Sequence, residues 1–309
     1  MNRRRAGGLF LACLLAVATL LSVGAGAARA ASGKLTIESG GLKRTAFLVE
    51  RVRLKQAPRP TIVVLHGQSG TGLRARRNLG LEDLKSPGVA VVYLDAIDGH
   101  WDVGDARSQR DAQFVRDTVA KLIADGVTDR RRVFLVGAST GGMLAYRVAC
   151  ADPAMFAGVA VLISNMTAAD APNCKPSAPV ALMSIAGVAD PVTPYAGGKA
   201  NLSDFKDELV SVDASLAPFR QAAGCGQKTS AELPDRDPND GSRVFVDKWA
   251  GCKRPIELVR IEGGGHALPG RVRLGLDRGQ PVGAHNRDVD AARLVIDFMK
   301  RVEAERASR

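Results

Sequence analysis

Several sequence features that mark particular classes of protein are missing from this chain. Its longest apolar stretch, residues 9–23, is shorter than the roughly 20 residues that span a bilayer. No Cys-x-x-Cys pair or histidine cluster indicates a zinc site. No Lys/Arg cluster with interleaved aromatic residues indicates a nucleic-acid interface. We therefore expect no transmembrane helix, no metal and no nucleic-acid partner.

Internal repeats and Ser/Thr-rich or Pro-rich linkers are also missing. The 309 residues are 46% hydrophobic and 24% charged, which is enough apolar content for a full core. We predict a single domain over residues 31–309. Its oligomeric state is not indicated by the sequence.

The N-terminus has the pattern of a signal peptide. Arg3, Arg4 and Arg5 precede the apolar stretch, and the small-residue run ends in Ala28-Arg29-Ala30, an Ala-x-Ala cleavage pattern. Cleavage after Ala30 lowers the basic count from 43 to 39 against 32 acidic residues, so the formal net charge falls from +11 to +7. We predict a secreted or periplasmic protein with no stable membrane insertion after cleavage.

The mature chain retains an even number of cysteines: Cys150, Cys174, Cys225 and Cys252. In an oxidising compartment an even number favours two disulfides, and four cysteines allow three pairings. Proximity along the chain favours Cys150 with Cys174 and Cys225 with Cys252.

Apolar runs alternate with helical patterns through the rest of the chain. A hairpin is expected around Gly40-Gly41, with both of its strands at a sheet edge. Buried strands are predicted at 61–65, 89–94, 133–136, 158–163, 180–185 and 256–261, and helices at 109–124, 143–150 and 288–302. This order predicts an α/β fold with a mostly parallel sheet and helices on both faces. Residues 195–251 are expected to be less regular, with an exposed loop at 234–241.

The most informative motif lies at residues 137–141. A predicted strand runs into Gly137-Ala138-Ser139-Thr140-Gly141 and directly into a predicted helix, the context of a nucleophile elbow. Small residues on either side of Ser139 permit a tight turn that presents its hydroxyl. A glycine-rich turn without chemistry is the alternative.

Two backbone N–H groups are candidates for binding an oxyanion. The N–H of Thr140 lies at the start of the predicted helix, beside Ser139. A second donor is expected from the loop after the strand at 61–65, and Gln68 is our candidate. The side chain of His66 in the same loop is expected to be structural.

A serine nucleophile needs a base, and in this motif's fold the chain order is serine, acid, histidine. Only His266 and His285 follow Ser139. His266 comes directly after the predicted strand at 256–261 and is our candidate base. His285 precedes the final helix and is expected to be a solvated flanking residue.

Asp190 is our candidate for the acid. It follows the predicted strand at 180–185, and Pro191 and Pro194 restrain its loop. Its carboxylate would accept the Nδ1 hydrogen of His266. A turn-capping role is the alternative for this residue, and Glu262, Asp170 and Asp213 lack its placement.

Trp101 lies in a polar loop after the predicted strand at 89–94. It either stacks on a substrate or packs within its loop. The sequence leaves both roles open.

These motifs together resemble the polyhydroxybutyrate depolymerase and feruloyl esterase group of secreted α/β-hydrolases, over about residues 34–301. The resemblance rests on segments 65–67, 99–101, 137–147, 190–195 and 263–270. It implies an α/β-hydrolase fold and Ser139, Asp190 and His266 as a catalytic triad. It also implies ester hydrolysis without a metal or organic cofactor.

The chain departs from this group at two positions. Leu268 stands where a tryptophan is common, and Gln68 stands where the depolymerase branch often has cysteine. Because no tethered polymer-binding module is apparent, we expect a small or oligomeric ester as the substrate rather than a solid polymer. We predict a serine carboxylic-ester hydrolase. The alternatives are hydrolysis of a thioester or amide, or a catalytically idle protein that binds carbohydrate or polymer on the same fold.

Overall fold

The computed structural model describes residues 33–50, 58–84, 88–105, 108–203, 205, 207–270 and 282–308. The predicted signal peptide lies outside the described residues. No helix in these ranges is both long and apolar enough to cross a membrane.

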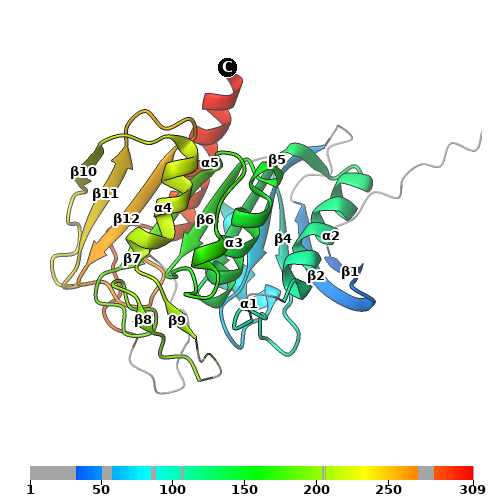
Figure 1. The fold of residues 1–309 in the computed structure, drawn as a ribbon, viewed down its shortest axis with the longest axis horizontal. Coiled ribbons are helices and arrows are strands. Elements are labelled where there is room, and N and C mark those ends of the chain that lie inside the picture. The colour runs from blue at the N-terminus through cyan, green and yellow to red at the C-terminus, as the bar shows by residue number, and fades with distance from the viewer. Residues whose placement is uncertain are drawn as a thin grey trace, which may run out of the picture.

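A ten-stranded sheet forms the centre of the fold (Figure 1). Its strands, in spatial order, are β1 (Gly33–Ser39), β2 (Leu42–Glu50), β4 (Ala90–Leu94), β3 (Arg59–Leu65), β5 (Thr128–Ala138), β6 (Gly158–Leu162), β7 (Ala181–Gly187), β12 (Ile256–Glu262), β11 (Arg243–Trp249) and β10 (Lys228–Glu232). The run from β4 to β12 is parallel, and antiparallel hairpins extend both ends. A separate pair, β8 (Gly198–Lys199) and β9 (Glu208–Leu209), forms a two-stranded sheet.

Helices cover both faces of the sheet. The helices are α1 (Gly72–Leu79), α2 (Arg110–Ala124), α3 (Thr140–Ala151), α4 (Val212–Ala223) and α5 (Ala291–Ala307). On one face α2, α3 and α4 pack against alternate strand residues such as Val63 and Leu65. On the other face α1 and α5 pack against Ile62 and Val64. Because both faces are covered, the central strands are continuous apolar runs, as predicted.

The predicted elements agree with the structure over most of the chain. Each predicted buried strand and helix is present, with ends that differ by up to five residues. The first hairpin turns at Gly40 and Gly41, which both have positive φ. One detail was wrong: β1 is an edge strand, but β2 also pairs with β4 and therefore lies inside the sheet.

The expectation of less regular structure at 195–251 was also wrong. This region contains α4, β10 and β11. Helix α4 was not predicted because Pro218, a residue that usually interrupts helices, lies inside it. Strand β10 was not predicted because all five of its residues are exposed, so it has no apolar pattern. Helix α1 was missed as well, although Thr71 caps its N-terminus and Gly80 ends it with a positive φ. The exposed loop at 234–241 is confirmed.

The two disulfides pair as sequence proximity indicated. Cys150–Cys174 joins the end of α3 to the segment after β6. Cys225–Cys252 joins the end of α4 to the connection between β11 and β12.

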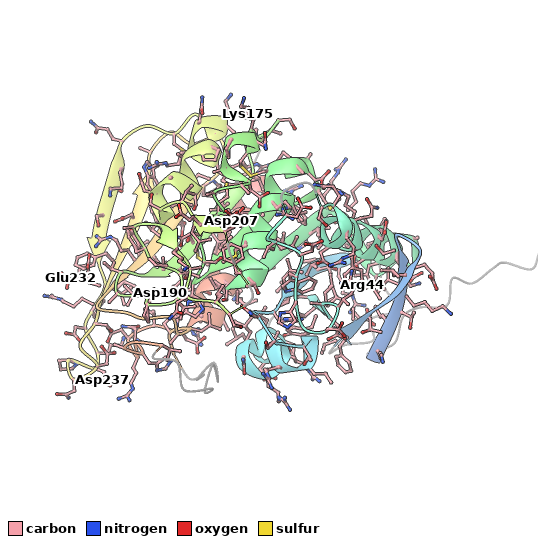
Figure 2. All side chains as sticks on the ribbon, turned by 60° about the horizontal axis from the view of Figure 1, so that its bottom comes forward. Arg44, Lys175, Asp190, Asp207, Glu232 and Asp237 are labelled. Carbon is pink, nitrogen blue, oxygen red and sulfur yellow. A yellow bond between two sulfur atoms is a disulfide. The ribbon has the colours of Figure 1, made fainter. Side chains whose placement is uncertain are left out.

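A buried ion pair fixes the loop that follows β4. Arg147 on α3 contacts Asp170 at 3.0 Å, and both side chains are less than 10% exposed. The same guanidinium donates to the carbonyls of Asp102 and Val103. The neighbouring Asp111 accepts the N–H of Asp102 and pairs with Arg44 at 2.8 Å. Figure 2 shows Arg44 at the β1–β2 end of the molecule, opposite Glu232 and Asp237.

Arg147→Ala should therefore lower the free energy of unfolding by about 3–5 kcal/mol, because it leaves the buried Asp170 carboxylate without its partner. Urea unfolding of the mature protein measures this loss. Lys300→Ala is the matched control, since Lys300 and Asp297 form an exposed pair worth at most about 1 kcal/mol. Equal losses in the two variants would contradict this account of Arg147.

Candidate active site

The carboxyl ends of the parallel strands bring the predicted residues together. His66, Ser139, Asp190 and His266 follow β3, β5, β7 and β12 respectively. In open α/β sheets this edge is where ligands bind.

Ser139 lies at a sharp turn between β5 and α3. Its backbone has φ 53° and ψ −123°, a strained conformation for a residue with a side chain. A Cβ at Gly137 would lie 2.2 Å from the carbonyl oxygen of Gly141. A Cβ at Gly141 would lie 2.5 Å from the carbonyl oxygens of Leu65 and His66. The turn therefore requires glycine at both motif positions, so it has the form of a nucleophile elbow.

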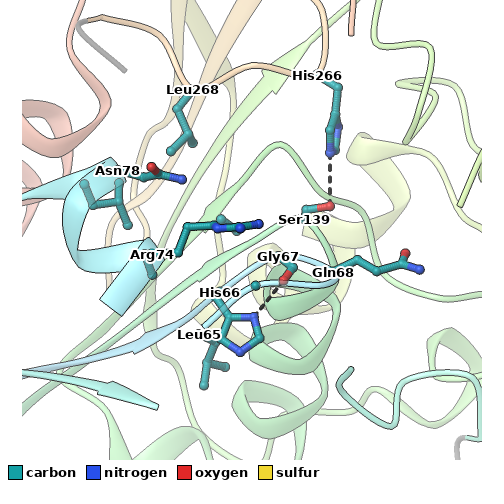
Figure 3. A pocket seen from close by; sticks show the side chains of 13 residues that line it. Leu65, His66, Gly67, Gln68, Arg74, Asn78, Ser139, His266 and Leu268 are labelled. Carbon is teal, nitrogen blue, oxygen red and sulfur yellow. Dashed lines mark hydrogen bonds between the residues drawn. The ribbon is translucent and has the colours of Figure 1, made fainter. Parts of the chain in front are cut away.

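His266 lies against the Ser139 hydroxyl, as Figure 3 shows. Its Nε2 is 3.0 Å from Ser139 Oγ, and its Nδ1 is 2.7 Å from Asp190 Oδ2. The three residues are nearly inaccessible to solvent, with exposed fractions of 4% for Ser139, 0% for His266 and 6% for Asp190. A hydrogen on Nδ1 leaves Nε2 free to accept the Ser139 proton.

Asp190 is held by its own loop. Its Oδ1 accepts the N–H groups of Val192 and Thr193, both at 2.8 Å. One carboxylate oxygen thus caps the turn while the other contacts His266, and the role of Asp190 as the catalytic acid stays a prediction. The bonds to Oδ1 fix the carboxylate orientation that His266 requires.

Thr193 is a site residue that sequence reasoning missed. Its hydroxyl is 2.9 Å from Asp190 Oδ2 and 3.2 Å from His266 Nδ1. Its position three residues after the candidate acid was the available signal, because threonine at that spacing commonly bonds a turn aspartate.

Thr140 directly follows Ser139, and Gln68 lines the same pocket as Ser139. Thr140 is the first residue of α3, so its N–H has no acceptor within the helix. Gln68 belongs to the loop after β3, where a Cβ at Gly67 would be only 3.3 Å from Ser139 Cβ. Their use as oxyanion donors stays a prediction.

His66 has a structural role, as expected. Its Nε2 accepts the N–H of Ala96 at 3.1 Å, and its Nδ1 is 2.6 Å from the carbonyl of Gly67. These bonds define a neutral ring with its hydrogen on Nδ1. Burial lowers the pKa of His66 below its usual value of 6.5.

Trp101 and His285 do not contact the Ser139 hydroxyl. The indole N–H of Trp101 donates to the carbonyl of His66 at 2.7 Å, and the residue is 5% exposed. These contacts show the loop-packing role, and a substrate contact by Trp101 stays a prediction. His285 bonds the carbonyl of Leu268 at 2.9 Å and is half-buried rather than fully solvated.

Two cavities adjoin the site. The Ser139 pocket has a volume of about 50 Å³. It is lined by Leu65, His66, Gly67, Gln68, Gly70, Arg74, Ala75, Asn78, Leu79, Ala138, Ser139, His266 and Leu268. The Trp101 pocket has a volume of about 370 Å³. It is lined by Gln68, His100, Trp101, Val103, Gly104, Thr140 and Phe205. Within the described ranges, no group of three or more His, Cys, Asp or Glu side chains is placed to hold a metal ion.

Comparison with known proteins identifies the class. Residues 62–278 match the model of the alpha/beta hydrolase family, and the chain belongs to this family. It is an esterase-like member with feruloyl esterases among its relatives.

The relatives cover different shares of the chain. The esterase-named protein NocK of Nocardia uniformis subsp. tsuyamanensis is 29% identical over 78% of this chain and 74% of its own. Feruloyl esterase B of Piromyces equi is 25% identical over 62% of this chain but only 36% of its own length. Acetyl xylan esterase from Aspergillus awamori has the same fold, with a TM-score of 0.55, 14% identity, and coverage of 76% of this chain and 94% of its own.

Stability should decrease in acid partly because of His66. Its pKa is lowered in the folded protein, so below about pH 6.5 the unfolded chain binds a proton that the folded chain resists. His66→Asn should therefore show a shallower loss of unfolding free energy between about pH 7 and pH 5, by at most about 1.4 kcal/mol per pH unit. Urea unfolding across this range measures the slope. Identical slopes in variant and wild type would show that His66 binds protons equally in both states.

Proposed function

We propose that this chain is an exported serine carboxylic-ester hydrolase that acts through an acyl-enzyme on Ser139. The observation that supports it best is the continuous hydrogen-bonded chain from Ser139 through His266 to Asp190. Such an arrangement activates a hydroxyl that is otherwise a weak nucleophile.

In the first half of the reaction, Ser139 Oγ attacks the ester carbonyl while His266 Nε2 takes its proton. Asp190 stabilises the imidazolium that forms. The N–H groups of Thr140 and Gln68 stabilise the negative oxygen of the tetrahedral intermediate. His266 then gives the proton to the leaving alkoxide, and the alcohol departs.

In the second half, water replaces the alcohol. His266 takes a proton from water as the water oxygen attacks the acyl carbonyl. When the new intermediate collapses, the proton returns to Ser139 Oγ and the acid leaves. The Ser139–His266 distance of 3.0 Å is suitable for both transfers.

The names of similar proteins support a carboxylic ester as the substrate rather than another acyl compound. The similar proteins of Nocardia uniformis and Piromyces equi are both named as esterases. We propose a small or oligomeric ester as the substrate. A thioester or amide hydrolase, or an idle binding protein, are the competing functions.

His266→Gln and Ser139→Ala should each lower kcat on p-nitrophenyl esters by about 10⁴-fold or more, because the nucleophile and base act as one unit. His285→Gln is the matched control, since this half-buried histidine bonds only the Leu268 carbonyl among the described residues. Its kcat should stay within about threefold of wild type, the range of a change that leaves transition-state contacts intact. Circular dichroism verifies folding. Substantial turnover by Ser139→Ala would refute the mechanism.

A fluorophosphonate probe distinguishes the enzyme from an idle binder. Wild type should be labelled at Ser139, and Ser139→Ala should not be labelled, because the probe reacts only with an activated serine. Labelled protein that turns over an amide or thioester but no ester would favour the competing hydrolase. Absence of labelling in folded protein would favour the idle binder.

Export gives a separate prediction. The two disulfides are typical of an oxidising compartment, which supports secretion or a periplasmic location. N-terminal sequencing of the protein recovered outside the cytoplasm should begin at Ala31. A mature chain that begins at Met1 in the cytoplasm would overturn this part of the proposal.

A further inference from the structure

Apolar side chains form much of the wall of the Ser139 pocket. Its apolar wall consists of Leu65, Ala75, Leu79, Ala138 and Leu268. Among the described residues that line it, none is Asp or Glu, and Arg74 supplies the one side chain with a permanent charge. A charged group at the edge of an apolar pocket beside a nucleophile discriminates between substrates by charge.

Arg74 and Asn78 share one face of α1. They are four residues apart, as are the pocket residues Ala75 and Leu79, so this face of the helix forms a wall of the pocket. Figure 3 shows the Arg74 side chain extending toward Ser139, with Asn78 beside Leu268. Both side chains thus present hydrogen-bond donors to the same cavity.

Neither side chain has a strong partner within the described part of the chain. The Arg74 guanidinium makes one long hydrogen bond, 3.4 Å to the carbonyl of Ser69, and no ion pair. Arg76 on the same helix, by contrast, pairs with Glu82. The Asn78 carboxamide makes no hydrogen bond to the described residues. The described lining of the pocket therefore has a cationic donor, Arg74, but no carboxylate to match it.

We propose that Arg74 and Asn78 bind a carboxylate on the acyl part of the substrate. This inference rests on the proposed esterase function and specifies its substrate class: half-esters of short dicarboxylic acids. The planar guanidinium matches the two oxygens of a carboxylate, and the Asn78 amide supplies a further donor. A volume of about 50 Å³ holds only about three or four water-sized groups, so the spacer between the scissile carbonyl and the carboxylate is short and apolar.

The test compares two esters with the same number of carbons: p-nitrophenyl hexanoate and the mono-p-nitrophenyl ester of adipic acid. Wild type should prefer the adipate half-ester in kcat/KM after correction for spontaneous hydrolysis. Arg74→Gln should lower the adipate-to-hexanoate ratio about tenfold, equal to about 1.4 kcal/mol. Arg74→Lys should keep part of the preference, because it retains the charge but not the planar fork.

Arg130→Gln is the matched control. It removes the same charge from an exposed position near the start of β5, at the opposite end of that strand from Ser139. The ratio should be unchanged in this variant. Raising the salt concentration should reduce the wild-type preference and leave the Arg74→Gln ratio unaffected.

Four outcomes would overturn the inference. An adipate-to-hexanoate ratio of kcat/KM that is the same in wild type and Arg74→Gln would show that Arg74 does not bind the carboxylate. An equal loss of kcat/KM on both esters in Arg74→Gln would show that Arg74 has only a structural role. Failure of wild type on both esters, with no fluorophosphonate labelling, would refute the proposed function and this inference with it, whereas turnover of hexanoate without a preference refutes the inference alone.

Discussion

At Ser139 the chain passes from strand to helix through a backbone conformation that a residue with a side chain adopts only under restraint. The restraint comes from close packing of backbone on backbone. Gly141 approaches the carbonyls of Leu65 and His66 so closely that no Cβ fits between them. The loop after β3 is thereby positioned relative to Ser139 by main-chain contact. The placement of the candidate oxyanion donors depends on this contact.

The loops around this turn are fixed by buried charges. Asp190 receives two backbone N–H bonds and the Thr193 hydroxyl, so its carboxylate faces His266 in one orientation. On the other side, Arg147 holds the carbonyls of the loop that carries Trp101. Buried charges that are fully hydrogen-bonded hold loops more rigidly than apolar contacts, because each bond has a required direction.

Much of this arrangement could be predicted from the sequence, for reasons that differ between elements. Buried parallel strands have strong apolar patterns, and chain order selected Ser139, Asp190 and His266, which the structure brings into contact. Their catalytic roles remain proposals. By contrast, β10 is exposed throughout and is formed by backbone pairing, so it leaves no pattern to detect. The contacts of Thr193 and the position of Arg74 in the Ser139 pocket could not be predicted, because they depend on which loops and helices meet in space.

The exposed strand β10 also has a consequence for the protein in solution. An open sheet edge offers unpaired N–H and C=O groups on which another molecule can add a strand. Here the edge strand is only five residues long, and it ends in the charged side chains of Lys228 and Glu232, which pair with Asp247 and Arg243 of the neighbouring strand. A strand from a second molecule would have to displace solvent from these charges. The β10 edge of the sheet thus resists aggregation through its polarity.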